Sequence, residues 1–321
     1  MLKLARHVTL RQLQIFEAIG RLKNFTRVAE ELFLTQSTVS TQVKHLSELA
    51  GIPLVEVVGK KTYLTEAGEI FYHACQDVIN RLDNVEMAFS DLKGIKTGTL
   101  KLSVITTAKY FAPEVLGKFW QLYPDIEVSL EVNNKENILQ RLRDNEDDLY
   151  ILGHNPPREL DIESIEFAVN PLYVMASKKH PLAKQKKRFS LKELAEYPFI
   201  QRETGSGIRQ AIETLSKSKG VKPNVRMVLS NNEAIKHALI GQLGISVLSL
   251  HTILLEGVKG PLALLNVEGF PIQRKWHLVY RKGKELSVVA KSFIEFLQEE
   301  GKRLNQQVDE LAQKIDPKIR N

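Results

Sequence analysis

A run of short polar side chains between residues 36 and 45 offers hydrogen-bonding groups of the kind that read DNA. Glutamine can bond N6 and N7 of adenine together, hydroxyl groups can reach base edges or phosphates, and lysine can place a charge at a phosphate. Taken alone, the same run also describes a solvated helix face capped by Thr35. The side chains concerned are Gln36, Ser37, Thr38, Ser40, Thr41, Gln42, Lys44 and His45.

A basic loop follows this run and favours the DNA-reading interpretation. Two short apolar segments, 54–58 and 62–64, flank a Gly-Lys-Lys tip, which predicts a β-hairpin whose lysines can press on backbone phosphates. A helix pair followed by such a hairpin forms a winged helix-turn-helix. The expected DNA contacts outside the polar run are Thr26, Thr35, Lys60 and Lys61.

A second group of polar residues, in the larger C-terminal part of the chain, has the chemistry of an anion site. These residues follow predicted strands, and open α/β sheets bind ligands beyond the carboxyl ends of their strands. Hydroxyl groups, a guanidinium and the N–H groups of a helix start suit a carboxylate or phosphate, although a Gly-Ser-Gly turn alone is an ordinary helix cap. The expected effector contacts are Thr106, Thr107, Asn134, Gln201, Arg202, Thr204, Gly205, Ser206, Gly207 and Ser246.

Three helices must position the polar side chains of residues 36–45. Apolar residues at helical spacing predict a helix over residues 10–19, a short one starting near Thr26, and a third over 36–50 that Gly51 and Pro53 end. A small residue would let the last two helices cross closely, and one face of the third helix would meet the core. The residues expected in these roles are Ala29, Val39, Val43 and Leu46.

A long helix follows the hairpin, because neither proline nor glycine occurs between Gly68 and Gly94 and Thr65 is suited to cap its start. Apolar residues recur along it at coiled-coil spacing, which favours a dimerisation rod of roughly 43 Å over a helix that packs on its own domain. A dimer would let two small heads read two half-sites. The expected seam residues are Phe71, Cys75, Val78, Leu82, Val85, Phe89 and Leu92.

Beyond Gly98 the pattern alternates between strands and helices, which predicts two α/β lobes joined by two crossovers around a cleft. The tail after residue 302 keeps helical spacing, so it either extends the last helix onto the body or mediates contacts between dimers. The predicted strands are 100–105, 126–132, 149–152, 172–176, 199–201, 225–229, 245–248 and 276–280. The predicted helices are 113–123, 136–145, 207–219, 233–241 and one from Leu286.

Composition places the chain among folded, soluble proteins. It has 321 residues, 43% of them apolar, and its net charge of +7 is compatible with a polyanionic partner. One cysteine excludes an internal disulfide, no cysteine or histidine cluster has metal-ligand spacing, and no signal peptide or apolar run of ~18 residues occurs, so we expect a cytoplasmic protein without a metal. Nucleotide-binding and catalytic motifs are absent, so we expect neither enzymatic activity nor a cofactor.

Two segments of the head resemble the N-terminal signature of LysR-type transcriptional regulators. They are residues 25–43 (FTRVAEELFLTQSTVSTQV) and 64–68 (LTEAG). The chain departs from the family at Val57, where the hairpin commonly carries an arginine, which leaves the phosphate contacts to the two lysines at its tip. The resemblance implies a regulator that binds double-stranded promoter DNA, pairs through the long helix and forms tetramers, with RNA polymerase a further candidate partner.

Three segments of the body resemble the CbbR/CmpR-like branch of that family. They are residues 106–113 (TTAKYFAP), 144–152 (DNEDDLYIL) and 202–209 (RETGSGIR). The resemblance implies control of carbon-fixation or inorganic carbon uptake genes. It also implies a metabolite effector such as ribulose 1,5-bisphosphate, 2-phosphoglycolate or 2-oxoglutarate. A LysR-type regulator of another metabolic regulon is the alternative within the family.

These observations predict a winged helix-turn-helix head, a linker helix and a two-lobed α/β effector domain similar to type 2 periplasmic binding proteins. The expected boundaries are 1–64, 65–94 and 95–321, with lobe I at 95–167 and 271–302, lobe II at 168–270 and a tail at 303–321. In a different class, the body by itself would suit a small-molecule binding or transport protein. The DNA-reading head and the lack of an export signal favour the regulator.

Overall fold

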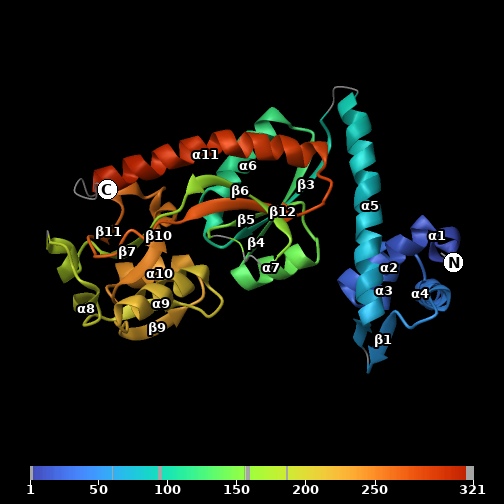
Figure 1. Cartoon of the computed structure of the whole chain (residues 1–321), viewed down its shortest axis with the longest axis horizontal. Helices are drawn as coiled ribbons and strands as arrows, with labels where there is room; N and C mark the ends of the chain where they lie inside the picture. Colours follow the sequence, from blue (N-terminus) through green and yellow to red (C-terminus); the bar gives the residue numbers. More distant parts are fainter. Residues whose placement is uncertain are drawn as a thin grey trace. The chain divides into compact units, whose positions relative to one another are not determined.

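The chain forms two compact units, residues 1–93 and 94–321 (Figure 1). The computed structural model describes residues 3–59, 61–92, 96–154, 156, 160–185 and 187–315. Lys60, predicted at the hairpin tip, lies outside the described residues. Within these described ranges, no helix is both long enough and apolar enough to cross a membrane.

The first unit begins with a winged helix-turn-helix, as predicted. Side-chain caps set its helix starts: Thr9 forms a capping box with Gln12, Asn24 caps the next helix and Thr35 caps the recognition helix. The buried core between the helices includes Phe16. The elements are α1 Lys3–His7, α2 Leu10–Leu22, α3 Phe25–Glu31, α4 Gln36–Ala50, β1 Val55–Val58 and β2 Lys61–Leu64.

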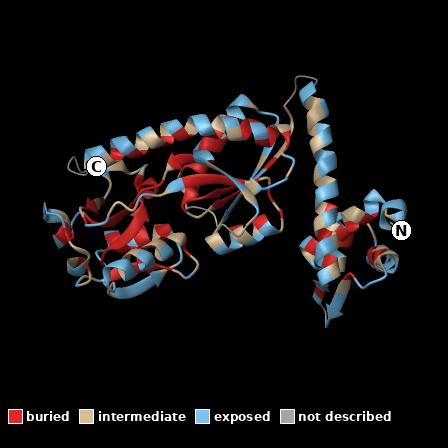
Figure 2. Ribbon diagram, in the orientation of Figure 1, coloured by how far each residue is buried: buried red, intermediate tan, exposed pale blue. Residues whose placement is uncertain are grey.

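The long helix α5 (Glu66–Leu92) starts inside the head, which corrects the predicted seam. Cys75 is fully buried in the head core, and the ring of Phe71 meets Phe16 of the same chain edge-on at 5.0 Å. Both side chains are therefore core residues of this head, and burial raises the pKa of the Cys75 thiol to about 12. The rest of the predicted stripe is solvent-exposed (Figure 2), namely Val78, Leu82, Val85, Phe89 and Leu92.

Lobe I of the second unit is built on a five-stranded mixed sheet with the order β4-β3-β5-β12-β6. The first three strands are parallel, as the βαβαβ pattern predicts, whereas β12 runs antiparallel to both of its neighbours. Strand β6 was not predicted from the sequence. The elements are β3 Gly98–Ile105, α6 Ala112–Leu122, β4 Ile126–Asn133, α7 Lys135–Arg143, β5 Leu149–Leu152, β6 Ile162–Val169 and β12 Lys275–Arg281.

Lobe II holds an antiparallel sheet, β10-β7-β11, beside a parallel pair, β8-β9. A parallel bridge between Phe199 and Ile245 joins the two sheets. Strand β11 and helix α8 were not predicted. The elements are β7 Leu172–Ser177, α8 Leu191–Leu194, β8 Phe199–Arg202, α9 Gly207–Lys219, β9 Val225–Leu229, α10 Asn232–Ile240, β10 Ser246–Ser249 and β11 Leu262–Leu265.

Two crossovers connect the lobes side by side. The first follows β6 and the second precedes β12, and backbone bonds link them from Asn170 N–H to the Arg274 carbonyl (2.7 Å) and from Leu172 N–H to the Ile272 carbonyl (3.0 Å). The last helix, α11 (Val288–Ile315), is continuous through the predicted tail and extends along both lobes (Figure 1). Its C-terminal turns pack on the body, which is one of the two roles that the sequence left open.

A buried histidine beside the crossovers makes the stability of this unit sensitive to acid. The indole N–H of Trp276 donates to Nε2 of His251 (3.0 Å), and burial lowers the pKa of His251 to about 4. The unfolded chain then binds a proton between pH 6.5 and 4 that the folded chain does not. The free energy of unfolding should therefore fall on acidification through that range, by at most about 1.4 kcal/mol per pH unit from this group.

Urea unfolding at pH 7, 6 and 5 measures this effect. Both tryptophans, Trp120 and Trp276, belong to the second unit, so their fluorescence reports on it. Burial also lowers the pKa of His180 and of His277, so only the difference from a His251→Gln variant isolates His251. Equal pH slopes for the two proteins would refute the assignment.

Candidate effector pocket and DNA-reading surface

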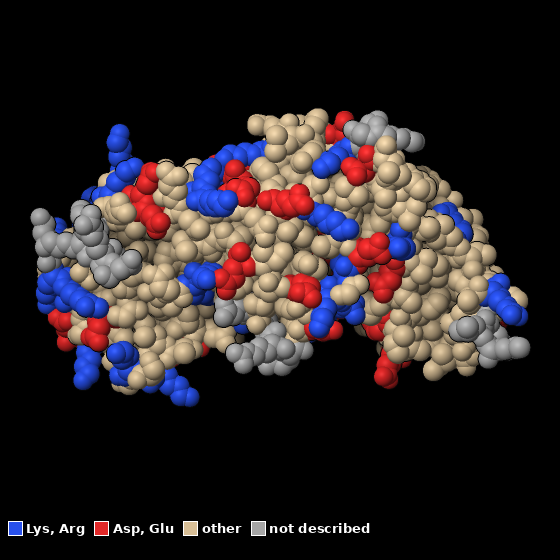
Figure 3. Space-filling view, turned by 45° about the horizontal axis from the view of Figure 1, so that its top comes forward, with Lys and Arg blue, Asp and Glu red and all other residues tan. Residues whose placement is uncertain are grey.

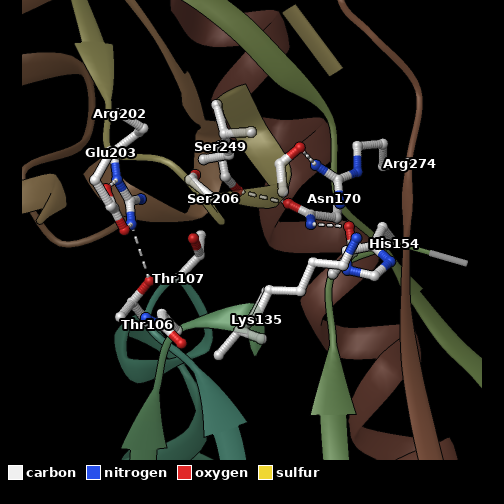
Figure 4. A pocket seen from close by; sticks show the side chains of 15 residues that line it. Thr106, Thr107, Lys135, His154, Asn170, Arg202, Glu203, Ser206, Ser249 and Arg274 are labelled. Carbon is white, nitrogen blue, oxygen red and sulfur yellow. Dashed lines mark hydrogen bonds and ion pairs between the residues drawn. The ribbon is translucent and has the colours of Figure 1, made fainter. Parts of the chain in front are cut away.

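A polar pocket lies between the two lobes, where the strands of both lobes end (Figure 4). Loops after β3, β4, β5, β8 and β10 contribute to it, together with both crossovers and the start of α9. This is the position that the strand-end argument predicts. Its lining residues are Ile105, Thr106, Thr107, Asn134, Lys135, Gly153, His154, Asn170, Arg202, Glu203, Ser206, Gly207, Ile208, Ser249 and Arg274.

One side of the pocket concentrates positive charge. Lys135 extends toward the side that carries His154 and Arg274 (Figure 4). Burial and the nearby Arg274 guanidinium lower the pKa of Lys135, and burial lowers the pKa of Arg274 to about 10. Burial disfavours the charge of both cations, and Arg274 further disfavours that of Lys135, so a bound anion would stabilise both charges.

The N-terminus of α9 adds hydrogen-bond donors to the same side. The Ser206 side chain does not cap this helix, and no acidic residue lies in its first turn. A Cβ atom at Gly207 would come within 3.0 Å of the His154 ring and 3.4 Å of Arg274, so glycine lets both side chains approach the helix start. Unsatisfied N–H groups at a helix N-terminus favour an anion.

The opposite side of the pocket is nearly neutral, which changes the role predicted for Arg202. Its guanidinium makes two bonds to Glu203 (2.7 and 2.8 Å), and the side chain is only 3% exposed. It also donates to Asn232, and to Thr106 of lobe I at 3.4 Å. Because its charge is already paired, Arg202 ties the lobes together. Among the described residues, Lys135 and Arg274 have no carboxylate partner: Lys135 donates to the side-chain oxygen of Gln210 (2.9 Å), and Arg274 donates to a backbone carbonyl.

Six of the ten predicted effector residues line this pocket: Thr106, Thr107, Asn134, Arg202, Ser206 and Gly207. Thr204 and Gly205 line a neighbouring pocket instead, which shares Lys135 and Ser206 with the first. Two predictions are wrong because the side chains are engaged elsewhere. Gln201 donates to Glu213 (3.3 Å), and the buried Ser246 hydroxyl donates to the Ile200 carbonyl (2.7 Å).

The sequence argument missed the residues that crossovers and loop packing bring to the pocket. Asn170 and Arg274 lie on the two crossovers, and Asn170 is held by Ser249 (2.7 Å) and the Gly153 carbonyl (3.0 Å). Lys135 had a usable signal, since it directly follows the predicted Asn134. Nothing in the sequence around Arg274 indicated that it would face the α9 start, where it donates to the Gly207 carbonyl (3.3 Å).

The recognition helix presents its predicted polar face to solvent. The exposed residues on and beside it are Thr26, Thr35, Gln36, Ser37, Thr38, Ser40, Thr41, Lys44 and His45. Thr35 has a structural role as well, because its hydroxyl accepts from the Thr38 N–H (3.2 Å) and bonds to two neighbouring hydroxyls. Gln42 is half-buried, and its amide oxygen accepts from Gln12 (2.9 Å), so it joins α2 to α4.

The hairpin beside this helix has an exposed lysine and an exposed apolar side. Lys61 lies in β2 rather than at the tip, opposite Val58, and its side chain is exposed. Val57 is 60% exposed. On the face shown in Figure 3, basic and acidic side chains are interspersed, so the net positive charge is spread over the surface there. Among the described residues, no group of histidine, cysteine, aspartate or glutamate could hold a metal ion.

A winged helix-turn-helix on a long helix, together with a two-lobed domain that has a polar pocket between its lobes, is the architecture of a ligand-responsive DNA-binding protein. Residues 10–69 match the family described as "Bacterial regulatory helix-turn-helix protein, lysR family", and residues 93–302 match "LysR substrate binding domain". The chain belongs to the LysR family of transcriptional regulators. The match of the head decides against the transport-protein alternative.

Several relatives are similar over nearly the whole chain. The transcriptional activator CmpR of Synechocystis sp. is 50% identical, covering 91% of this chain and 95% of CmpR. A RuBisCO operon transcriptional regulator of Acidithiobacillus ferrooxidans is 45% identical, covering 91% and 94%. These relatives are regulators and not enzymes, as predicted for this chain.

Solved structures agree with the fold. The regulatory domain of Synechocystis CcmR, solved in complex with 2-phosphoglycolate (2-PG), is 47% identical and has a TM-score of 0.62, covering 65% of this chain and 99% of that domain. Full-length CbnR complexed with its target DNA is 20% identical, with a TM-score of 0.63, and covers 91% of this chain and 99% of CbnR. The second likeness supports the fold alone.

Proposed function

We propose that this protein regulates carbon-fixation or inorganic carbon uptake genes, and that a small phosphorylated metabolite in the interlobe pocket controls it. The observation that carries the proposal is that Lys135 and Arg274 both line the pocket beside the α9 N-terminus, and that neither cation has a carboxylate partner among the residues that the structure describes. The kind of genes that it regulates is inferred from the names of its relatives, CmpR and the RuBisCO operon regulators.

The polarity of the pocket suggests how such an effector is oriented. A phosphate dianion has the charge and the acceptor atoms for the cationic side, where two cations and backbone N–H groups converge. The hydroxyl groups of Thr106 and Thr107 on the other side suit a carboxylate or hydroxyl of the same molecule. We assign Asn134, which follows β4 and lines the pocket, to the same contact set.

Calorimetric titration of the full chain tests this assignment. The compounds are 2-phosphoglycolate, ribulose 1,5-bisphosphate, 2-oxoglutarate and NADPH, and the variants are Thr107→Ala and Lys135→Ala. Saturable binding of one phosphorylated compound that both variants weaken would support the proposal. If none of the four compounds binds, the effector assignment fails, whereas membership of the LysR family stands on the two domain matches.

The head and α5 provide DNA binding and the pairing of two chains. We propose that the exposed face of α4 reads promoter DNA in the major groove, and that the exposed apolar stripe of α5 pairs two chains so that two heads read two half-sites. Lys61 and Lys60 would meet phosphates beside the groove. Two such dimers on adjacent sites would form the expected tetramer, with RNA polymerase as a further partner. Such a regulator works on the chromosome, in the cytoplasm.

A change at the first residue of the recognition helix is expected to lower discrimination between operator and random DNA. Gln36 is exposed, and a glutamine amide can make two bonds to one adenine, so Gln36→Ala should cost about 1 to 3 kcal/mol of specific binding. Fluorescence anisotropy with both DNAs at one salt concentration measures this. Loss of affinity for both DNAs in equal proportion would assign Gln36 to the phosphate backbone instead.

A further inference from the structure

The last turns of α11 extend beyond the part of the chain that the family match covers. The match to the LysR substrate binding domain ends at residue 302, whereas α11 continues without a break to Ile315. Buried residues recur along this extension at helical spacing, so one face of it is packed. These residues are Leu304, Val308 and Leu311.

The part of α11 up to Arg303 is anchored to lobe I. Phe293 packs against Phe119 of α6, with ring centroids 5.1 Å apart in an edge-to-face arrangement. Two ion pairs tie the same helices together, Lys118 with Glu300 (3.1 Å) and Glu114 with Arg303 (2.9 Å). This part of the helix therefore moves with lobe I.

The middle of α11 presses on the end of β6, where the first crossover begins. A Cβ atom at Gly301 would lie 2.0 Å from the Phe167 carbonyl oxygen, so only glycine permits this approach. One turn later, the Asn305 side-chain oxygen accepts from the Val169 N–H (2.7 Å). The helix is thus fastened to the backbone that must bend when the lobes change their angle.

The extension itself is anchored to lobe II. Val308 and Leu311 belong to a core cluster with residues of β7, α10, β10 and β11, and Ala312 and Ile315 pack against its edge. One continuous helix therefore has apolar anchors in both lobes and a hydrogen bond to the crossover between them. Figure 2 shows the buried positions along its inner side.

We propose that residues 303–315 act as a brace that restrains the angle between the lobes and so sets how tightly the interlobe pocket holds its anion. On the pocket side, the present angle brings the Tyr110 hydroxyl to Glu233 (2.5 Å) and the Asn232 amide to Thr107 (3.3 Å). Opening the lobes breaks these bonds and also requires α11 to bend or to slide over lobe II. The brace opposes that motion.

Loosening the brace is therefore expected to populate open lobes and to weaken anion binding. The part concerning affinity rests on the proposed effector pocket, whereas the part concerning the lobe angle does not. The test variant is Val308→Ala with Leu311→Ala in the full chain, and the matched control is Asp309→Ala on the exposed side of the same turns. Gly301→Ala is a second test variant, because its added methyl group would push α11 away from Phe167 at the start of the crossover.

Two measurements test the lobe angle and the anion affinity separately. Spin labels on cysteines introduced at the exposed Glu127 of lobe I and Lys217 of lobe II report the interlobe distance by pulsed electron paramagnetic resonance. Buried Cys75 is not expected to take up label. Titration with 2-phosphoglycolate reports affinity. We expect a broader, longer distance distribution and a 3- to 10-fold rise in Kd for the test variant, and neither change for Asp309→Ala.

An unchanged distance distribution in a folded test variant would overturn the brace, whatever the affinity. Altered distances with unchanged affinity would overturn its role in anion binding. If the wild-type chain does not bind 2-phosphoglycolate, the effector proposal fails while the distances still decide on the brace. Should the double variant not fold, as judged by circular dichroism and Tm, Val308→Ala alone and Gly301→Ala carry the same test.

Discussion

Replacing Arg274 with methionine is expected to weaken the binding of a phosphorylated effector by about 10- to 150-fold. A hydrogen bond to a charged group contributes about 1.5 to 3 kcal/mol, and methionine keeps the unbranched stem of the side chain without the charged guanidinium group. Arg274 lies where burial lowers its pKa to about 10, which indicates a desolvated guanidinium that an anion would stabilise. Titration calorimetry with 2-phosphoglycolate measures the change.

The same substitution at the exposed Arg281 provides the control, since that residue ends β12 and does not line the pocket. We expect wild-type affinity there. A loss at Arg274 no larger than that at Arg281 would show that the cationic end of the pocket does not bind the effector. A comparable loss for Arg202→Met would show that the ion pair with Glu203 opens to bind the anion.

A second large effect, on dimer formation, is expected from aspartate substitutions on α5. Leu82 and Val85 are exposed in the single chain, and together with their neighbours they form an apolar stripe that is costly to leave in water. Aspartate at both positions would bring carboxylates into the apolar seam of a dimer, at a cost of several kcal/mol. We expect the dimer to dissociate and operator affinity to fall about 100-fold or more, because single heads lose the second half-site.

Light scattering after size-exclusion chromatography and a gel-shift titration measure the two parts of this prediction. Asn80→Asp introduces one carboxylate on the opposite side of α5 and should leave both results unchanged. An intact dimer in the Leu82→Asp, Val85→Asp variant would place the interface elsewhere. A dissociated dimer that still binds operator with wild-type affinity would refute the role of α5 in pairing the heads.

Local chemistry explains why so much of the fold could be predicted. Helices 36–50 and 207–219 were predicted with the bounds that the structure shows, because each begins after a polar residue in extended conformation and ends at a glycine with positive φ, Gly51 and Gly220. The strand 149–152 was likewise predicted with its observed bounds, since it is apolar throughout and buried at the centre of its sheet.

Other elements escaped prediction because long-range packing creates them. Strand β6 carries exposed polar residues at several positions, so its pattern is weak, and it exists because it pairs along β12. Helix α5 shows one continuous apolar seam in sequence, but contact with Phe16 assigns the first part of that seam to the head core. Spacing alone does not distinguish an apolar residue that meets its own chain from one that meets a partner.

The sequence by itself determined the architecture, the polar face of α4 and the family resemblance, because caps, periodicity and motif residues act over a few neighbouring positions. Only the tertiary structure decided which charge is available to an effector. Arg202 pairs with the adjacent Glu203, whereas Lys135 and Arg274, 139 positions apart, meet where a strand end faces a crossover. Electrostatic interactions depend on distance in space, and folding alone sets that distance.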